Sequence, residues 1–326
     1  MKRTRCFMHE FLVVLLFALG IVLIVKGGDF FVDAASWIAE VSGIPKLIIG
    51  ATIVSVATTL PELLVSVMAA IGGKTEMAVG NAVGSVTANI ALIMAIALIF
   101  MAGPIKRKDY LVKSLLMIGS AVIIAVCAFF GEVNIIFSIL LLIIFIIFII
   151  ENVISAKRSS LEDGGDGNEA VKKDGKTIVT NILKFALGAA GIVWGADLLV
   201  DNGSEIARWL GVSERIIGVT IVAVGTSLPE LVTTITAIAK KQSSLSAGNI
   251  IGANIIDMTL IMPLCAVVSG ASLAIASTAI LDLVACLVVG LVALVPALIM
   301  KKFAKWQGYL LLVLYVVYVT LTITLF

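Results

Sequence analysis

The sequence contains the same long pattern twice, 168 positions apart. Residues 50–66, GATIVSVATTLPELLVS, are repeated as residues 218–234, GVTIVAVGTSLPELVTT. The alignment continues without a gap well to either side of this stretch. Upstream, for example, residues 17–20 and residues 185–188 are both Phe-Ala-Leu-Gly. A match of this length does not arise by chance, so the chain is an internal duplication and must fold as two copies of one unit.

The composition places both copies in a membrane. Of the 326 residues 61% are hydrophobic and 13% are charged, and the mean hydropathy is +1.18, values typical of an integral membrane protein. Several apolar runs exceed the roughly 20 residues that a span needs, so tilted or broken helices are expected. The runs predict ten transmembrane helices, near residues 11–38, 47–71, 77–101, 111–130, 135–154, 179–209, 215–239, 246–268, 275–299 and 307–326.

Each copy carries five of these helices. Because five is odd, the second copy must enter the membrane from the side opposite to the first. The predicted fold class is therefore an all-α integral membrane protein with ten transmembrane helices in two inverted-topology five-helix repeats, residues 1–155 and 179–326. Inverted repeats are the plan of many secondary transporters, whose sites lie at the midplane between the halves.

Residues 156–178 are the one extended polar segment, and we interpret them as a flexible cytoplasmic linker between the repeats. We expect the protein in the plasma membrane. By the positive-inside rule this linker and most of the lysines then lie on the cytoplasmic side. Both termini are then expected outside, although the basic start of the chain opposes this assignment. The basic residues assigned to the cytoplasmic side are Lys106, Arg107, Lys108, Lys157, Arg158, Lys172, Lys173, Lys176, Lys240, Lys241, Lys301, Lys302 and Lys305.

The repeated stretch places a carboxylate inside an apolar helix. On a helical period the small polar residues of the first copy share one face with Glu62. Pro61 cannot donate a backbone N–H, so carbonyls about one turn earlier, around Ser55 to Ala57, are expected to lose a partner. Hydroxyls, freed carbonyls and a glutamate make an oxygen lining, which hard cations such as Na⁺ and Ca²⁺ require. Glu230 has the same position in the second copy.

The following helix of each repeat carries a second polar stripe. Asn81, Ser85 and Asn89 recur at every fourth residue, and their counterparts are Asn249, Ala253 and Asp257. Glycines at 80, 84, 248 and 252 would let helices approach closely. Such an approach would bring Asn89 and Asp257 up to the two glutamates.

A purely structural role is the alternative for every polar residue in these helices. Asn81 and Asn249 suit hydrogen bonding between helices as well as they suit ion binding, and Ser66 and Thr234 suit it better. For the carboxylates Glu62, Glu230 and Asp257 it is a poor explanation, since a charge at mid-membrane costs on the order of 3 kcal/mol. Apart from Arg215 at the very start of the predicted helix 215–239, neither glutamate helix contains Lys or Arg, so cations are the missing partners. The acidic residues expected to be interfacial or salt-bridged instead are Asp29, Asp33, Asp109, Asp197, Asp201 and Asp282.

Enzyme and nucleic-acid functions find no support. The four cysteines lack C-x-x-C spacing, His9 is the only histidine, and no G-x-S-x-G or paired aspartyl motif occurs. The net charge of +2 reflects membrane topology. We therefore expect no enzymatic activity, no cofactor, no nucleic acid and no obligatory protein partner. The expected partners are the lipid bilayer and the transported ions.

In these motifs the chain resembles the calcium/cation antiporter superfamily, and most closely its prokaryotic sodium/calcium exchanger branch. The motifs are Ala57-Thr-Thr-Leu-Pro-Glu62 with Gly80-Asn-Ala-Val-Gly-Ser85, and Gly225-Thr-Ser-Leu-Pro-Glu230 with Gly248-Asn-Ile-Ile-Gly252. The resemblance covers essentially the whole chain. It implies four clustered cation sites enclosed by helices two, three, seven and eight. It also implies alternating access by sliding of the long first and sixth helices.

The resemblance also implies roles for single residues. Glu62 and Glu230 would be shared calcium ligands, Asn89 and Asp257 would close the centre, and Ser85 would close a flanking sodium site. The remaining calcium and sodium ligands implied are Thr58, Thr59, Thr226, Ser227 and the carbonyls of Ser55 and Ala223. Ala253 departs from the family pattern, which usually offers a serine there, and this puts the matching sodium site in question.

The leading hypothesis is antiport of Ca²⁺ against Na⁺. A proton-coupled exchanger is the nearest alternative, because carboxylates also carry protons. Asp257 opposite Asn89 is similar to the potassium-dependent exchangers, so coupling to K⁺ stays open. A cation channel could use the same oxygens, but the inverted repeat and the lack of a repeated pore-loop signature disfavour it.

Overall fold

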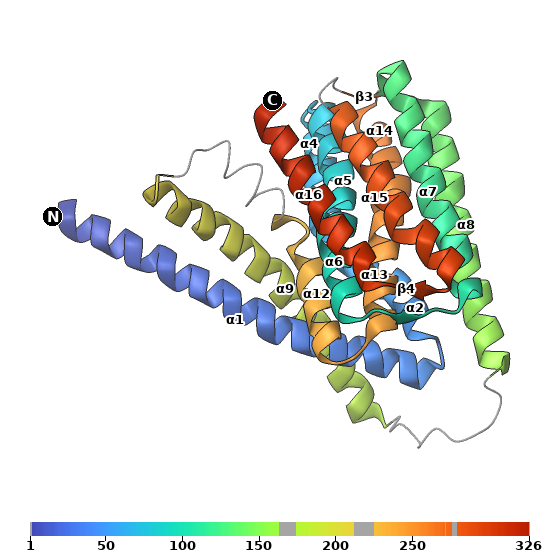
Figure 1. Ribbon diagram of the computed structural model, residues 1–326. Coiled ribbons are helices and arrows are strands. Elements are labelled where there is room, and N and C mark those ends of the chain that lie inside the picture. Colours follow the sequence, from blue (N-terminus) through green and yellow to red (C-terminus); the bar gives the residue numbers. More distant parts are fainter. Residues whose placement is uncertain (1, 163–173, 212–224, 271, 276–278, 326) are drawn as a thin grey trace.

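The computed structural model describes residues 2–162, 174–211, 225–270, 272–275 and 279–325 (Figure 1). The described part is almost entirely helical, which confirms the predicted all-α class. The elements of the first repeat are α1 (Lys2–Ser42), α2 (Lys46–Ile49), η1 (Gly50–Val54), α3 (Ser55–Thr58), α4 (Leu60–Ile71), α5 (Thr75–Ala88), η2 (Asn89–Met94), α6 (Ala95–Phe100), β1 (Gly103–Pro104), α7 (Arg107–Phe130), β2 (Glu132–Val133) and α8 (Ile135–Glu162). Those of the second are α9 (Gly175–Trp209), α12 (Leu228–Ala239), α13 (Ser243–Ile256), η4 (Asp257–Ile261), α14 (Met262–Ser269), β3 (Leu273–Ala274), α15 (Ala279–Met300), β4 (Lys302–Phe303) and α16 (Lys305–Leu325).

Most of the predicted spans are present as helices. Within the described residues eight helices are long and apolar enough to cross a membrane, and Lys46–Thr58 with Leu60–Ile71 forms a ninth if this bent pair counts as one span. The predicted seventh span, 215–239, is represented by the shorter helix α12, and residues 215–224 lie outside the described ranges. The total of ten therefore stays a prediction. The predicted linker 156–178 is helical at both ends, since α8 reaches Glu162 and α9 begins at Gly175.

The second predicted span is broken, as its proline and its length suggested. The chain bends by 47° between α3 and α4, and Thr59 at the bend has φ −84° and ψ 4°. Pro61 lies in the first turn of α4, where a missing N–H costs no helical hydrogen bond. In the second copy Ser227 has φ −87° and ψ 6° immediately before α12, and Pro229 lies in the first turn of that helix. Each break brings a glutamate, Glu62 or Glu230, into the first turn of the following helix.

The turns preserve the duplication. Six of the seven left-handed residues in the described part form matched pairs, and Gly270 is the exception. The pairs are Gly43 with Gly211, Gly73 with Lys241, and Gly131 with Lys301. The first two pairs are 168 positions apart, but the third is 170 apart, so the register shifts by two residues after the third predicted helix. Two short antiparallel ladders link the repeats crosswise, with Gly103 opposite Phe303 and Val133 opposite Leu273. An offset of 170 residues relates Gly103 to Leu273 and Val133 to Phe303, so each ladder is the repeat counterpart of the other.

The two longest helices, α1 and α9, lie side by side and tilted across the other helices (Figure 1). Glycines allow their backbones to approach. A Cβ on Gly20 would lie 3.0 Å from the Gly195 carbonyl oxygen, and one on Gly27 would lie 2.9 Å from that of Gly188. Gly188 and Gly195 are the repeat counterparts of Gly20 and Gly27, so the crossing is symmetric.

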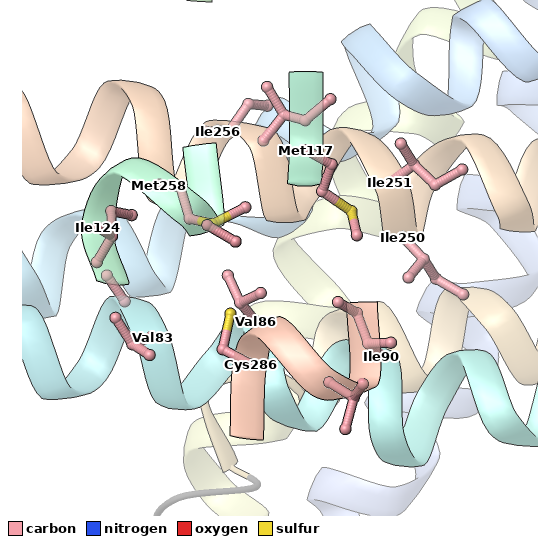
Figure 2. Packing of buried hydrophobic residues seen from close by; sticks show 14 of the residues in the cluster. Val83, Val86, Ile90, Met117, Ile124, Ile250, Ile251, Ile256, Met258 and Cys286 are labelled. Atoms are coloured by element: carbon pink, nitrogen blue, oxygen red, sulfur yellow. The ribbon is translucent and has the colours of Figure 1, made fainter. Parts of the chain in front are cut away.

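The main core lies between α5, α7, α13 and α15 (Figure 2). Val86 and Ile90 from the first repeat pack against Ile251 and Met258 from the second. All four side chains are fully buried. Branched aliphatic and methionine side chains fill the space between the helices, so the helices that carry the predicted site are held by close packing.

Candidate ion-binding site

Glu62 and Glu230 are completely buried at the two helix breaks. No carboxylate oxygen of either residue accepts a hydrogen bond within the described part of the chain. Ser227 approaches Glu62, and Thr58 approaches Glu230, without closing a hydrogen bond. Each glutamate is thus approached by a hydroxyl from the opposite repeat. Buried carboxylates without partners are costly, which makes these oxygens ready acceptors for a cation.

Asn89 and Asp257 occupy matching positions on the neighbouring helices. Asn89 begins the π-helical segment η2 and Asp257 begins η4. Both side chains are fully buried, and all their polar side-chain atoms lack hydrogen-bond partners among the described residues. Asp257 lies within electrostatic reach of both glutamates. A π-helical segment misaligns backbone hydrogen bonds and is frequent at functional sites. The π-helical segments and the unpartnered side chains of Asn89 and Asp257 therefore indicate a functional site at the same position in both repeats.

Among the described residues, no basic side chain forms an ion pair with these three carboxylates. Ion pairs elsewhere join Lys46 to Glu40, Lys113 to Glu151, Arg208 to Glu205, and Lys240 to Asp29 and Asp33. No three His, Cys, Asp or Glu side chains of the described part converge closely enough to hold one metal ion. An ion bound between the two glutamates would therefore take its remaining ligands from hydroxyl, amide or carbonyl oxygens.

Several of the predicted ligands are engaged in hydrogen bonds. Thr59 Oγ1 donates to the Ser55 carbonyl over 2.7 Å, and the Thr59 N–H donates to the same oxygen over 2.9 Å. The expected release of the Ser55 carbonyl is therefore wrong. The helix continues to Thr59, so its N–H still reaches Ser55, and the carbonyl that Pro61 cannot serve is that of Ala57 four residues earlier. A cation at Ser55 would have to compete with Thr59.

The third-helix asparagines act as connectors between helices. Asn249 accepts a hydrogen bond from Thr58 Oγ1 at its side-chain oxygen, over 3.2 Å, and one from Ser55 Oγ at its carbonyl, over 3.0 Å. Asn81 Nδ2 donates to Ser66 Oγ over 2.9 Å. In the second repeat Ser246 Oγ donates to Thr234 Oγ1 over 3.4 Å. The structural role weighed for Ser66 and Thr234 is therefore present.

Ser85 and Ala253 differ as the sequence shows. Ser85 Oγ lies 3.5 Å from Thr226 Oγ1, which brings together two predicted ligands from opposite repeats. Ala253 is fully buried and offers no side-chain oxygen. Ala223 lies outside the described residues, so its carbonyl has no described position. Of the predicted ligands with described side chains, Thr226 is the least enclosed, and the others are buried.

The acidic residues set aside in the sequence have different surroundings. Asp29 and Asp33 on α1 pair with Lys240 at the end of α12, over 3.4 and 2.7 Å, as the salt-bridge interpretation expected. Asp282 accepts a hydrogen bond from Tyr318 over 2.9 Å. Asp197 and Asp201 are exposed on α9, next to each other and in no ion pair of the described part. These contacts account for Asp29, Asp33 and Asp282 without a role in ion binding.

One buried charge pair escaped the sequence analysis. Lys113 on α7 is 1% exposed and donates to Glu151 on α8. The sequence did contain a signal for this pair, because the predicted helix 111–130 has a single lysine and the next predicted helix, 135–154, has a single glutamate. Asn254 on α13 was also missed. It is fully buried, and its side-chain oxygen accepts no hydrogen bond from the described residues.

Known proteins share this architecture. The sodium/calcium exchanger protein family matches residues 12–153 and again residues 180–324. The chain is 33% identical over 307 residues to an uncharacterised membrane protein of Methanocaldococcus jannaschii, covering 92% of this chain and 95% of that protein. It is 31% identical over 343 residues to the sodium/calcium exchanger MaX1 of Methanosarcina acetivorans, covering 93% and 96%.

A solved structure extends the likeness to three dimensions. The sodium-calcium exchanger NCX_Mj, soaked with Na⁺ and Sr²⁺, superimposes with a TM-score of 0.80 at 29% identity, covering 95% of this chain and 99% of that one. MaX1 and NCX_Mj are exchangers by name, not enzymes. The family match to both halves, the duplicated motifs and the common fold agree, and the chain belongs to the sodium/calcium exchanger protein family.

Proposed function

We propose that this protein exchanges Ca²⁺ against Na⁺ across the plasma membrane by alternating access to a site between Glu62 and Glu230. The observation that carries the proposal is the pair of fully buried glutamates, one from each repeat, whose carboxylate oxygens have no hydrogen-bond donor in the described part of the chain. A relative named sodium/calcium exchanger, alike over nearly the whole length, supports the choice of ions.

Antiport follows from competition for shared oxygens. Three carboxylates, Glu62, Glu230 and Asp257, can be balanced by monovalent cations, or by Ca²⁺ with one proton retained. If the empty, charged site reorients slowly, one ion must enter before the other returns. The glycine-lined crossing of α1 and α9 supports the proposed sliding of these helices, because shallow small-residue surfaces interlock less than large side chains do. The lysines at helix ends support a cytoplasmic linker and external termini.

The test is calcium uptake into proteoliposomes that contain the purified protein. An outwardly directed sodium gradient at clamped pH and membrane potential should drive uptake, and removing it should stop uptake. Potassium and proton gradients are varied singly in parallel. Uptake driven by a proton gradient without sodium would establish proton coupling instead, and a requirement for potassium together with sodium would establish the potassium-dependent alternative. Non-saturating flux would indicate a channel.

A further inference from the structure

A large open cavity of the described protein lies away from the proposed ion site. Its volume is about 870 Å³, and it is lined by the start of α2, the α6–α7 connection, and the α12–α13 turn. No predicted ion ligand with a described position lines it. The cavity lies at helix ends on the face predicted to be cytoplasmic, where membrane proteins meet lipid headgroups. It therefore needs an explanation of its own.

The charged rim of the cavity is basic. Lys46, Lys106 and Lys241 line it, against the single carboxylate of Asp109. Lys46 is paired with Glu40 over 3.0 Å, whereas Lys106 and Lys241 form no ion pair with any described residue. A passage for Na⁺ or Ca²⁺ would be lined by carboxylates, not by ammonium groups. The rim therefore suits an anion.

The inner wall of the cavity is apolar. Leu47, Met94, Leu98, Ile250 and Phe303 line it. At the rim, Ser243 and Ser244 add hydroxyl donors in the first turn of α13, a helix whose N-terminus has no side-chain cap. Helix N-termini favour negative charge. The lining is thus basic and hydrogen-bonding at the edge and hydrocarbon-like inside, which is the pattern of an anionic amphiphile.

We propose that this cavity binds an anionic phospholipid. The phosphate lies at the rim near Lys106, Lys241 and the α13 N-terminus, and an acyl chain lies against the apolar wall. Because the lining comes from α2, α6 and α7 of the first repeat and from α12 and α13 of the second, the bound lipid contacts both repeats on one side of the membrane. Occupancy then favours the arrangement of the repeats in which the cavity is formed.

Native mass spectrometry of the purified protein tests the proposal directly and does not depend on transport. Phosphatidylglycerol, phosphatidylcholine and inorganic phosphate are added separately at matched concentrations. One phosphatidylglycerol is expected to survive delipidation that removes phosphatidylcholine, with no adduct from inorganic phosphate. Equal retention of both lipids would overturn the proposal. A phosphate adduct that displaces the lipid would show a soluble-anion site and would also overturn it.

Substitutions locate the bound lipid. Lys106→Gln with Lys241→Gln should weaken phosphatidylglycerol binding by about tenfold or more, and Lys106→Arg with Lys241→Arg should restore it. Asp109→Asn should strengthen it, because this change removes the one carboxylate among the described residues that line the cavity. Lys74→Gln removes one charge on the opposite face, so it is the matched control for the single variants Lys106→Gln and Lys241→Gln and should have no effect. If Lys74→Gln weakens binding as much as either of these single variants does, the lipid is held by general surface charge and the cavity assignment is wrong.

Discussion

Gly27 of α1 crosses Gly188 of α9 so closely that a Cβ on Gly27 would lie 2.9 Å from the Gly188 carbonyl oxygen. The symmetric contact between Gly20 and Gly195 has the same character. Each contact places backbone against backbone, so no flexible side chain can yield. The two longest helices of the protein are thus held at a separation that only glycine permits.

Gly27→Ala should therefore destabilise the protein although alanine is the better helix former. Alanine gains up to about 1 kcal/mol in helix propensity, but relieving the contact should cost about 1–3 kcal/mol. Gly119→Ala on α7 is the control, since a Cβ there meets nothing within 4 Å. Thermal unfolding in detergent should show a lower Tm for Gly27→Ala and an unchanged or higher one for Gly119→Ala. Equal Tm values would show that α1 and α9 are not so close.

Glu62→Gln and Glu230→Gln should each abolish sodium-driven calcium uptake. Each change removes one charge from a dehydrated divalent site, which should reduce calcium affinity by about 100-fold or more. Both variants should stay folded, because neither carboxylate accepts a hydrogen bond from a described residue. Glu76→Gln, at the exposed start of α5, is the matched control and should transport normally. Normal uptake by a monodisperse Glu62→Gln protein would rule out the proposed site.

Asp257→Asn should flatten the pH dependence of calcium binding. Asp257 shares a buried environment with two further carboxylates, and no ion pair of the described residues neutralises them. As pH falls, protons compete with Ca²⁺ for these oxygens, so apparent calcium affinity of the parent should fall. Isothermal titration at several pH values compares the two proteins. If the slope is the same in both, Asp257 is not the group at which protons compete.

Ala253→Ser should raise apparent sodium affinity by about fivefold, the value of one added hydroxyl ligand or about 1 kcal/mol. Calcium affinity should stay near the parent value, because Glu62 and Glu230 lie on other helices. Ser85→Ala should lower sodium affinity in turn, since Ser85 lies 3.5 Å from Thr226 across the repeats. Sodium titrations of calcium efflux give both midpoints. An unchanged midpoint in Ala253→Ser would mean that position 253 does not line a sodium site.

Lys113→Met should be strongly destabilising, by about 3–5 kcal/mol, because it leaves Glu151 without its buried partner. The double variant Lys113→Met, Glu151→Met should recover most of this loss, since an apolar pair removes both desolvation costs. The coupling is obtained from the Tm values of both single variants and the double variant. Additive effects would show that the two side chains do not act as a pair.

The sequence by itself determined the class of the protein and the composition of its site. Repetition of Thr58, Pro61 and Glu62 as Thr226, Pro229 and Glu230 is a property of the chain alone. So is the odd number of predicted spans per copy, from which the inversion is predicted. The length of the apolar runs predicts that the carboxylates are buried, and the lack of basic residues around them predicts that they need cations. Both predictions depend only on local composition.

Tertiary structure decided which of those oxygens are free. Whether the Ser55 carbonyl is available depends on where the helix breaks, and the break after Thr59 keeps it bonded. Asn249 became a connector because α3 packs against α13, which brings Ser55 and Thr58 to it. The basic cavity and the Lys113–Glu151 pair join residues from separate helices. Contacts of this kind depend on helix packing, which is set by the whole fold and has no signature in any one segment.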